Sequence, residues 1–215
     1  MLITKFGFER EGKTMNDNNL DSRVRRTKRL LRQGLTELLK QKSIKKITVR
    51  ELSELIDINR GTFYLHYKDI YDLVDQIEKE LFDEFERILS NYTISDLGTR
   101  PHKIFSDVCS FLYANREICA ALLGDNGDIN FLLNLREFLR QKCLHDIIET
   151  YHIDRIPNYE YVYAYFESGT VGVLRYWLDH PEDGKTPDEI ASMIESIFTY
   201  GASLFKKDAE GRNGG

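Results

Sequence analysis

The chain has 215 residues, of which 41% are apolar and 30% charged, and it contains only four prolines. This length allows one large domain or two small ones, and the composition excludes a disordered, collagen-like or disulfide-stapled chain. Leucine, isoleucine, glutamate and lysine recur throughout the sequence, which favours an all-helical protein.

The two ends and the cysteines indicate the compartment. No apolar run reaches the roughly 18–20 residues of a membrane span, and the N-terminus lacks the apolar core of a signal peptide. Either Met15 is the true start or residues 1–19 form a flexible arm. Cys109, Cys119 and Cys143 are too few and too scattered for a disulfide framework, so we expect buried cysteines in a protein of the reducing cytoplasm.

The net charge of −5 conceals a basic block between Arg23 and Arg50. The block contains eleven basic residues and one acid, Glu37, so it carries about +10 and the remainder of the chain about −15. The basic residues are Arg23, Arg25, Arg26, Lys28, Arg29, Arg32, Lys40, Lys42, Lys45, Lys46 and Arg50. A solvated helix face usually mixes both signs, so this block indicates a surface for a polyanion, and for nucleic acid above all.

The first predicted helix begins at Ser22, a good capping residue, and runs to about Gln41 with leucines at helical spacing. Thr48 and Glu51 form a capping box that opens a second helix, which is expected to end near Ile56. The first helix lacks Trp or Phe on its apolar face, which argues against an anchor on a membrane surface.

The next elements have the dimensions of a helix-turn-helix. Asp57 lies in the turn, where a left-handed backbone is often required, and Asn59 caps a third helix that runs to about His66. Asp69 then caps a long fourth helix with one apolar stripe. After it, "SNYTISDLGTRP" (residues 90–101) is the most loop-like stretch and indicates a domain boundary near it.

Further helices are expected beyond this stretch. One runs to about Ala114, a short one ends at Gly124, a long amphipathic one covers 128–153, and an aromatic-rich one covers 158–180. Thr186 caps the last helix, with proline at its first position and Glu189 at its third. We assign the fourth helix to the larger C-terminal domain. The predicted organisation is a flexible arm over 1–20, a helix-turn-helix domain over 21–68, a larger helical domain over 69–206 and a disordered tail over 207–215.

The composition of the third helix suits a helix whose N-terminal end enters a major groove. Arg60 can reach a guanine edge with two hydrogen bonds, and Gly61 lets the backbone approach the DNA closely. Thr62, Tyr64 and His66 carry hydrogen-bonding tips that suit phosphate oxygens. The aromatic residues Phe63 and Tyr67 share a face, and we expect them to hold the short helix against the first two.

The segment "TVRELSELIDINRGTFYLHYKDIYDL" resembles the DNA-binding segment of the TetR family of bacterial transcriptional regulators. The matching residues are Thr48, Leu52, Leu55, Ile56, Ile58, Gly61, Thr62, Phe63, Tyr64, His66, Tyr67 and Leu73. The stretch "SGTVGVLRYWLDH", followed by "TPDEIASMI", resembles the end of the family's ligand-binding domain. Two residues depart from the family pattern: Asp57 replaces the usual glycine, and Ile70 replaces the usual phosphate-binding lysine, for which Lys68 is a candidate substitute.

This resemblance implies a homodimeric regulator, mostly a repressor in this family, whose reading helices meet successive major grooves of a palindromic operator. The predicted DNA contacts are Arg25, Arg26, Thr27, Thr48, Asn59, Arg60, Gly61, Thr62, Tyr64, His66 and Lys68. The last two helices, over about 158–180 and 187–205, are expected to form a four-helix interface with the partner. The loss of lysine at Ile70 keeps a rival interpretation open: an adaptor of the same fold that acts through protein partners.

The family also implies a small apolar or aromatic effector that binds among the central helices. The candidate pocket residues are Phe105, Phe111, Phe131, Phe138, Tyr165 and Trp177, for each of which an ordinary place in the core is the alternative. Cys143 and His145 point to different helix faces, and His145 and Glu149 share a face but are too few for a metal site. With no catalytic or nucleotide-binding motif either, we predict no metal, no cofactor and no enzyme.

Overall fold

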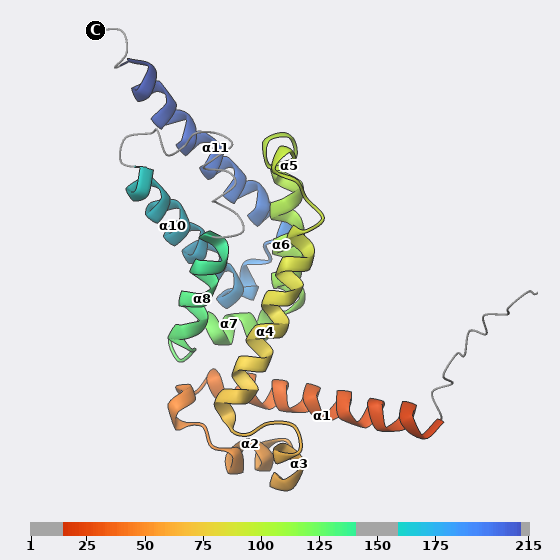
Figure 1. Cartoon of the computed structure of the whole chain (residues 1–215). Coiled ribbons are helices and arrows are strands. Elements are labelled where there is room, and N and C mark those ends of the chain that lie inside the picture. Colours follow the sequence, from red (N-terminus) through yellow and green to blue (C-terminus); the bar gives the residue numbers. More distant parts are fainter. Residues whose placement is uncertain (1–14, 141–158, 212–215) are drawn as a thin grey trace, which may run out of the picture.

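The computed structural model describes residues 15–140 and 159–211, and every regular element in these two ranges is helical. The longer helices are α1 (Met15–Leu39), α2 (Val49–Leu55), α3 (Arg60–Tyr64), α4 (Ile70–Leu89), α5 (Ile94–Thr99), α6 (Pro101–Ala114), α7 (Arg116–Leu123), α8 (Ile129–Leu139), α10 (Tyr159–Asp179) and α11 (Pro187–Gly211). Two short 3₁₀ turns, η1 (Ile44–Lys46) and η4 (Pro181–Asp183), complete the set. In Figure 1, α1, α2 and α3 form a head at one end, from which α4 leads into the body.

Side-chain caps set the start of each helix that follows α1 in the head. The Thr48 hydroxyl accepts a hydrogen bond from the Glu51 amide at 3.2 Å, and Asn59 Oδ1 accepts one from the Gly61 amide at 2.7 Å. Asp69 Oδ1 accepts one from Asp72 N at 2.9 Å at the start of α4. These three caps confirm the predicted helix starts, because each satisfies an amide that the helix itself leaves unpaired.

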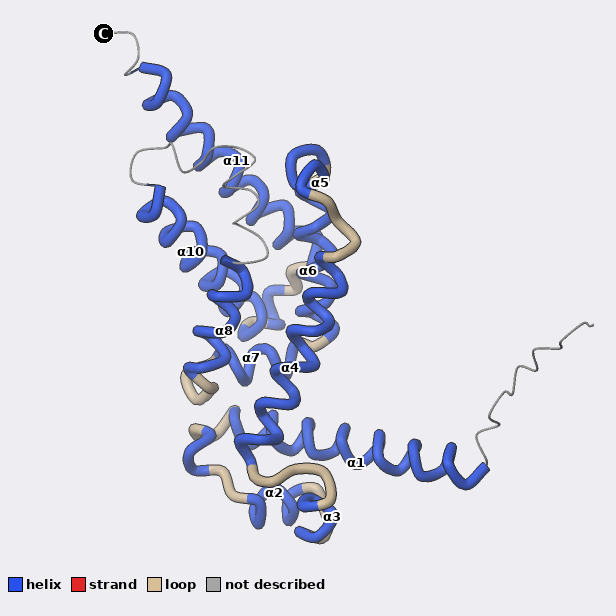
Figure 2. The backbone as a smooth tube through the Cα atoms, viewed as in Figure 1, coloured by secondary structure: helices blue, strands red, loops and turns tan. Residues whose placement is uncertain are grey.

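The turn between α2 and α3 has the predicted left-handed residue. Asp57 has a φ of 54°, and it is the one non-glycine residue with positive φ among those described. Figure 2 shows this connection as a short loop between the two helices. The family's usual glycine would adopt this conformation without strain, whereas Asp pays a small backbone cost for it.

A glycine lets α1 and α2 pack closely. A Cβ atom added at Gly34 would lie 2.8 Å from Leu52 Cδ1 and would also overlap Ile56 Cγ2. Both Gly34 and Leu52 are buried. The Leu52 side chain on α2 therefore occupies the space that a residue larger than glycine would need at position 34 of α1. The head is therefore a tightly packed unit.

The helix α4 joins the head to the body. Its first residue, Ile70, is buried in the core, together with Leu73, Ile77, Leu81 and Phe85 along the same helix. Toward its far end, Phe82 and Phe85 meet aromatic rings from α6 and α8. The departure from lysine at Ile70 thus places an apolar residue in the core, at a position that faces inward in this chain.

In the body, α10 and α11 run antiparallel beside one another (Figure 1). Arg116, at the start of α7, holds the end of α10 by donating hydrogen bonds to the carbonyl oxygens of Trp177 and Leu178. The predicted capping box of α11 is confirmed: Glu189 N donates to the Thr186 hydroxyl at 3.2 Å, and Thr186 N donates to Glu189 Oε2 at 2.9 Å. These contacts satisfy backbone groups at the end of α10 and at the start of α11, on both sides of the connection between them.

Several predicted boundaries differ from the structure. The helix α1 starts at Met15 instead of Ser22, because no glycine or proline interrupts the intervening residues. The stretch predicted as a loop contains α5, whose capping box joins Thr93 and Asp96. Gly124 ends α7 as predicted, but with an extended backbone instead of a left-handed one. The helix α11 continues to Gly211, through part of the predicted tail.

Among the described residues, no helix is long and apolar enough to cross a membrane. Nor do these residues contain a group of three or more potential metal ligands. Cys109 and Cys119 are buried as predicted, and burial raises the pKa of both thiols to about 12. Cys143, His145 and Glu149 lie outside the described residues.

Candidate nucleic-acid interface

The helix α3 is held to the head by one face and exposes the other. Phe63 is fully buried and Tyr67 almost so, and their ring centroids lie 5.8 Å apart. Burial raises the pKa of Tyr67 to about 12, so its hydroxyl stays protonated at neutral pH. This confirms the prediction that the two aromatic residues anchor the short helix, which as an isolated peptide would be too short to form.

The exposed side of α3 contains the predicted base reader, Arg60. Arg60, Gly61 and Tyr64 are exposed, and Tyr64 retains 58% of its accessible surface. No acidic side chain pairs with Arg60 within the described part of the chain, so its guanidinium keeps all its donors available. Thr62 and His66 are half-buried at the sides of the helix.

Two predicted contact residues already have a structural role as caps. Thr48 and Asn59 are both exposed, and each uses a side-chain oxygen to accept a backbone hydrogen bond. The Thr48 hydroxyl hydrogen and the Asn59 amide nitrogen are not used by those two bonds, so both groups can still donate to a phosphate. Capping and phosphate binding are therefore compatible at these two positions.

The helix start of α4 adds one further cation. Lys68 is exposed, and its backbone amide donates to Asp72 Oδ2 at 2.7 Å, which fixes the residue directly before α4. This bond is the largest cause that holds the pKa of Asp72 below its ordinary value. Lys68 thus adds an exposed positive charge on a fixed backbone in the connection between α3 and α4.

The basic block separates into paired and unpaired residues. Lys40 pairs with Glu37 and Glu117, Lys42 with Glu51, and Arg50 with Glu54, whereas Arg32 donates to the Asn115 amide oxygen at 2.8 Å. The remaining seven have no acidic partner among the described side chains. They are Arg23, Arg25, Arg26, Lys28, Arg29, Lys45 and Lys46.

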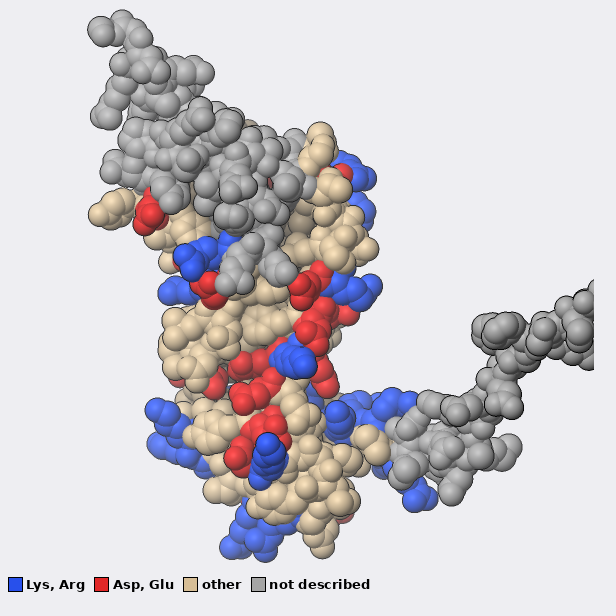
Figure 3. Space-filling view, in the orientation of Figure 1, with Lys and Arg blue, Asp and Glu red and all other residues tan. Residues whose placement is uncertain are grey.

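The unpaired cations lie on the head. Figure 3 shows Lys and Arg along α1 and around the lower end of the molecule, whereas Asp and Glu gather over the middle, along α4. Arg25 and Arg26 are exposed on α1, and the next residue, Thr27, is half-buried. The charge separation of the sequence is thus also a separation in space, and it gives the head a positive field.

Sequence reasoning missed three exposed residues next to this surface. Lys45 and Lys46 in η1 belong to the basic block but were not assigned a contact, and Leu65 at the end of α3 was not considered at all. The two adjacent lysines between the first and second helices could have indicated a further phosphate contact. Leu65 lies four residues after Gly61, and this spacing could have placed it on the exposed face.

The predicted ligand residues do not form one group. Phe111, Phe131 and Phe138 pack with Phe82 and Phe85 of α4, with centroid distances of 4.7–6.0 Å. Phe105 is half-buried against the same core, whereas Tyr165 is 72% exposed on α10. The phenylalanines thus form an aromatic core between α4, α6 and α8, and Tyr165 lies apart from it.

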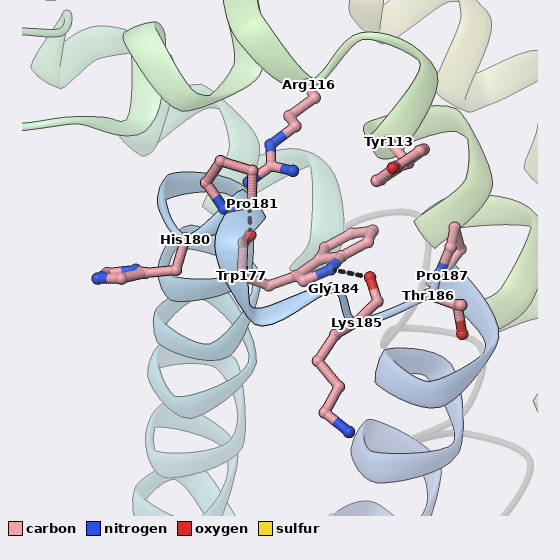
Figure 4. A pocket seen from close by; sticks show the side chains of 9 residues that line it. All are labelled: Tyr113, Arg116, Trp177, His180, Pro181, Gly184, Lys185, Thr186 and Pro187. Atoms are coloured by element: carbon pink, nitrogen blue, oxygen red, sulfur yellow. Dashed lines mark hydrogen bonds between the residues drawn. The ribbon is translucent and has the colours of Figure 1, made fainter.

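Trp177 lines a different space, a pocket of about 200 Å³ between α6, the end of α10 and the start of α11 (Figure 4). Its indole N–H donates to the Lys185 carbonyl oxygen at 2.9 Å, and its ring stacks with Tyr113 at 5.7 Å. The other lining residues are Arg116, His180, Pro181, Gly184, Thr186 and Pro187. None of the five other predicted ligand residues lines this pocket.

Known proteins share parts of this sequence and its fold. A family profile described as "Transcriptional regulator C-terminal region", from the TetR group, matches residues 99–200. The uncharacterized HTH-type transcriptional regulator YxbF of Bacillus subtilis (strain 168) is 20% identical over 174 residues, which are 79% of this chain and 44% of that relative. The chain therefore spans less than half the length of this curated relative.

Two solved structures share the fold. A TetR transcriptional regulator from Streptococcus agalactiae 2603V has a TM-score of 0.57 at 20% identity, covering 84% of this chain and 97% of that one. The fatty acid degradation regulator FadR from Bacillus halodurans has a TM-score of 0.53 at 10% identity, covering 81% and 93%. The fold, with its helix-turn-helix head, is thus shared with these solved structures, and residues 99–200 match the C-terminal region of the TetR group.

Proposed function

We propose that the protein is a sequence-specific DNA-binding transcriptional regulator that represses transcription as a homodimer on a palindromic operator. The observation that supports this most strongly is the state of α3: Phe63 and Tyr67 anchor the helix, and Arg60 at its start is exposed without an acidic partner among the described residues. A base-reading arginine needs a rigidly anchored helix and a charge that no acid neutralises, because a mobile or neutralised arginine could not select one base pair.

The roles of the surrounding residues follow from their positions. Arg60 reads a guanine edge, and Gly61 allows the close approach of the backbone. Phosphate contacts come from the remaining predicted residues: Arg25, Arg26, Thr27, Thr48, Asn59, Thr62, Tyr64, His66 and Lys68. Such contacts fix the orientation of the head without reading sequence, and the positive field of α1 increases the association rate.

The dimer forms through α10 and α11. These helices expose six large apolar or aromatic side chains: Tyr161, Tyr165, Tyr176, Met193, Ile197 and Tyr200. A Cβ atom added at Gly169 or Gly172 would meet no atom within 4 Å, so both glycines border open space in the single chain. An exposed apolar face with small residues suits close helix packing against a second copy.

This interface has a direct test. Because Gly169 is open in the monomer, Gly169→Arg leaves the fold of one chain intact and places a charge in the interface. We expect the variant to elute as a monomer with unchanged helicity, whereas Leu133→Arg, at an exposed position on α8, stays dimeric. A Gly169→Arg protein that remains a dimer would place the interface elsewhere.

A small apolar effector releases the repressor from DNA by binding in the pocket that Trp177 lines, which none of the other five predicted ligand residues borders. Trp177 is the one tryptophan in the chain, so its fluorescence reports on the pocket of Figure 4. We expect a true effector to change this fluorescence and to weaken DNA binding at the same concentrations. Compounds that do only one of these are not effectors.

DNA binding is tested by selection of duplexes from a random-sequence pool with the purified protein. We expect a palindromic sequence whose binding weakens steeply with salt, because neutralised phosphates release counterions. Arg60→Ala should lose about 1–3 kcal/mol of preference for the selected sequence. Arg26→Ala should weaken all sequences alike and lower the salt slope by about 1.

Arg87→Ala provides the matched control, because this exposed arginine on α4 pairs with Glu84 and lies outside the head. It should leave both affinity and preference unchanged. If no duplex is enriched at low salt, the proposal fails and the adaptor interpretation takes its place. If duplexes are enriched but Arg60→Ala keeps the preference, the protein binds DNA with a different base-reading residue.

A further inference from the structure

Leu65 is an apolar side chain on a surface that is otherwise polar and basic. It is 80% exposed, whereas the anchoring residues Phe63 and Tyr67 of the same short helix are buried. A single exposed leucine is common on protein surfaces and by itself indicates nothing. Its position relative to the other residues of α3 is what gives it significance.

The backbone fixes that position. The Leu65 amide donates to the Gly61 carbonyl oxygen at 3.2 Å, so the helical phase continues through Leu65. Residues four apart in a helix lie on the same side, so Leu65 stands directly beyond Gly61. A Cβ atom added at Gly61 would contact only Asn59 Oδ1, at 3.3 Å, so the space beside Leu65 is open.

Arg60 directly precedes Gly61, and Tyr64 directly precedes Leu65 one turn later. Both Arg60 and Tyr64 are also exposed. The four residues Arg60, Gly61, Tyr64 and Leu65 therefore form one continuous exposed strip, here named the reading face. Gly61 and Leu65 lie opposite the side anchored by Phe63, whereas Arg60 and Tyr64 lie beside it, because residues three apart are neighbours on a helix surface. In the sequence-specific complex Gly61 and Leu65 face the groove beside the base that Arg60 reads, whereas Tyr64 contacts a phosphate.

We propose that Leu65 recognises a thymine through its 5-methyl group in the major groove, beside the guanine read by Arg60. This inference rests on the proposed function. The edges of base pairs in the major groove are hydrogen-bonding groups, except for the thymine methyl, which is the apolar feature there. The exposed cations of the head, Arg60 and Lys68 among them, favour a polyanionic partner over an apolar protein surface.

The spacing along α3 also locates the base. Leu65 follows Arg60 by five residues, which is roughly 7.5 Å along the helix axis. Base pairs are about 3.4 Å apart along the duplex. The thymine is therefore expected within about two base pairs of the guanine that Arg60 contacts.

The test replaces each thymine of the selected duplex by uracil, one at a time, which removes only the methyl group. One replacement per half-site should weaken binding of the wild-type protein about fourfold, as expected for one buried methyl group. Leu65→Ala should bind the thymine and uracil duplexes with the same Kd, because it has no side chain to contact the methyl. Leu133→Ala, an exposed leucine on α8, should keep the fourfold difference.

The outcomes distinguish this inference from the proposed function. If no sequence is selected from the pool, the proposed function itself fails. If a sequence is selected but it lacks thymine near the guanine, or no uracil replacement matters, Leu65 does not read a methyl group. A thymine–uracil difference that persists in Leu65→Ala, or a change in the oligomeric state of that variant, would overturn the assignment too.

Discussion

Replacing Glu78 by Gln should stabilise the protein at high pH and leave its stability at low pH unchanged. Glu78 lies on α4 between head and body, is only 5% exposed, and its Oε1 atom has no hydrogen-bond partner among the described residues. Burial raises its pKa from 4.5 to about 7, and the charges of Asp128 and Asp75 act in the same direction. A hydrogen bond with Asn134 acts in the opposite direction.

The direction of the pH dependence follows from proton binding. Since the pKa of Glu78 is higher in the folded protein, the folded state binds more protons than the unfolded chain between pH 4.5 and about 7. The free energy of unfolding therefore falls as pH rises through this window. A rise in pKa from 4.5 to about 7 corresponds to roughly 3 kcal/mol at pH 8.

The assay is urea unfolding of wild type and Glu78→Gln between pH 4.5 and 8.5, at one protein concentration so that any contribution from self-association is the same in every experiment. The variant should gain roughly 3 kcal/mol at pH 8, and nothing near pH 4.5. Glu80→Gln, an exposed residue on the same helix, should show neither effect. Equal stabilisation at both pH values, or destabilisation at pH 8, would refute the buried-charge explanation.

Three further substitutions test the packing and the backbone of the head, each by urea unfolding followed by circular dichroism. Gly34→Ala should cost about 1–3 kcal/mol, because its methyl group would overlap Leu52 and Ile56; an unchanged midpoint would contradict the close packing of α1 on α2. Asn59→Ala should cost about 1 kcal/mol and weaken DNA binding through loss of the α3 cap, whereas a neutral result would show that α3 needs no cap. Asp57→Gly should instead stabilise by up to about 1 kcal/mol, because glycine adopts the left-handed turn without strain; destabilisation would indicate a role for the Asp57 carboxylate.

The parts of the fold that depend on local chemistry were predictable. A cap involves residues two or three apart, so Thr48, Asn59, Asp69 and Thr186 could be assigned from sequence spacing. The same holds for the left-handed Asp57. Their shared property is that a few neighbouring residues determine the backbone conformation.

Features that depend on distant residues could not be predicted in this way. The burial of Glu78 results from packing of α4 beside α8, which no pattern within α4 reveals. Tyr165 resembled a pocket residue by composition, yet it points outward from α10. The phenylalanines of the aromatic core were predicted as candidate ligand residues, because the sequence does not distinguish mutual packing from the lining of a ligand site.

The unbroken helix α4 has a mechanical consequence. Its 20 residues extend from Ile70 in the core of the head to the aromatic rings around Phe85, a length of about 30 Å. If such a rod pivots at the aromatic end by about 6°, its other end moves by about 3 Å, close to the rise of one base pair, about 3.4 Å. A displacement too small to disturb the packing around Phe85 can therefore shift a DNA-reading helix by one step of the duplex.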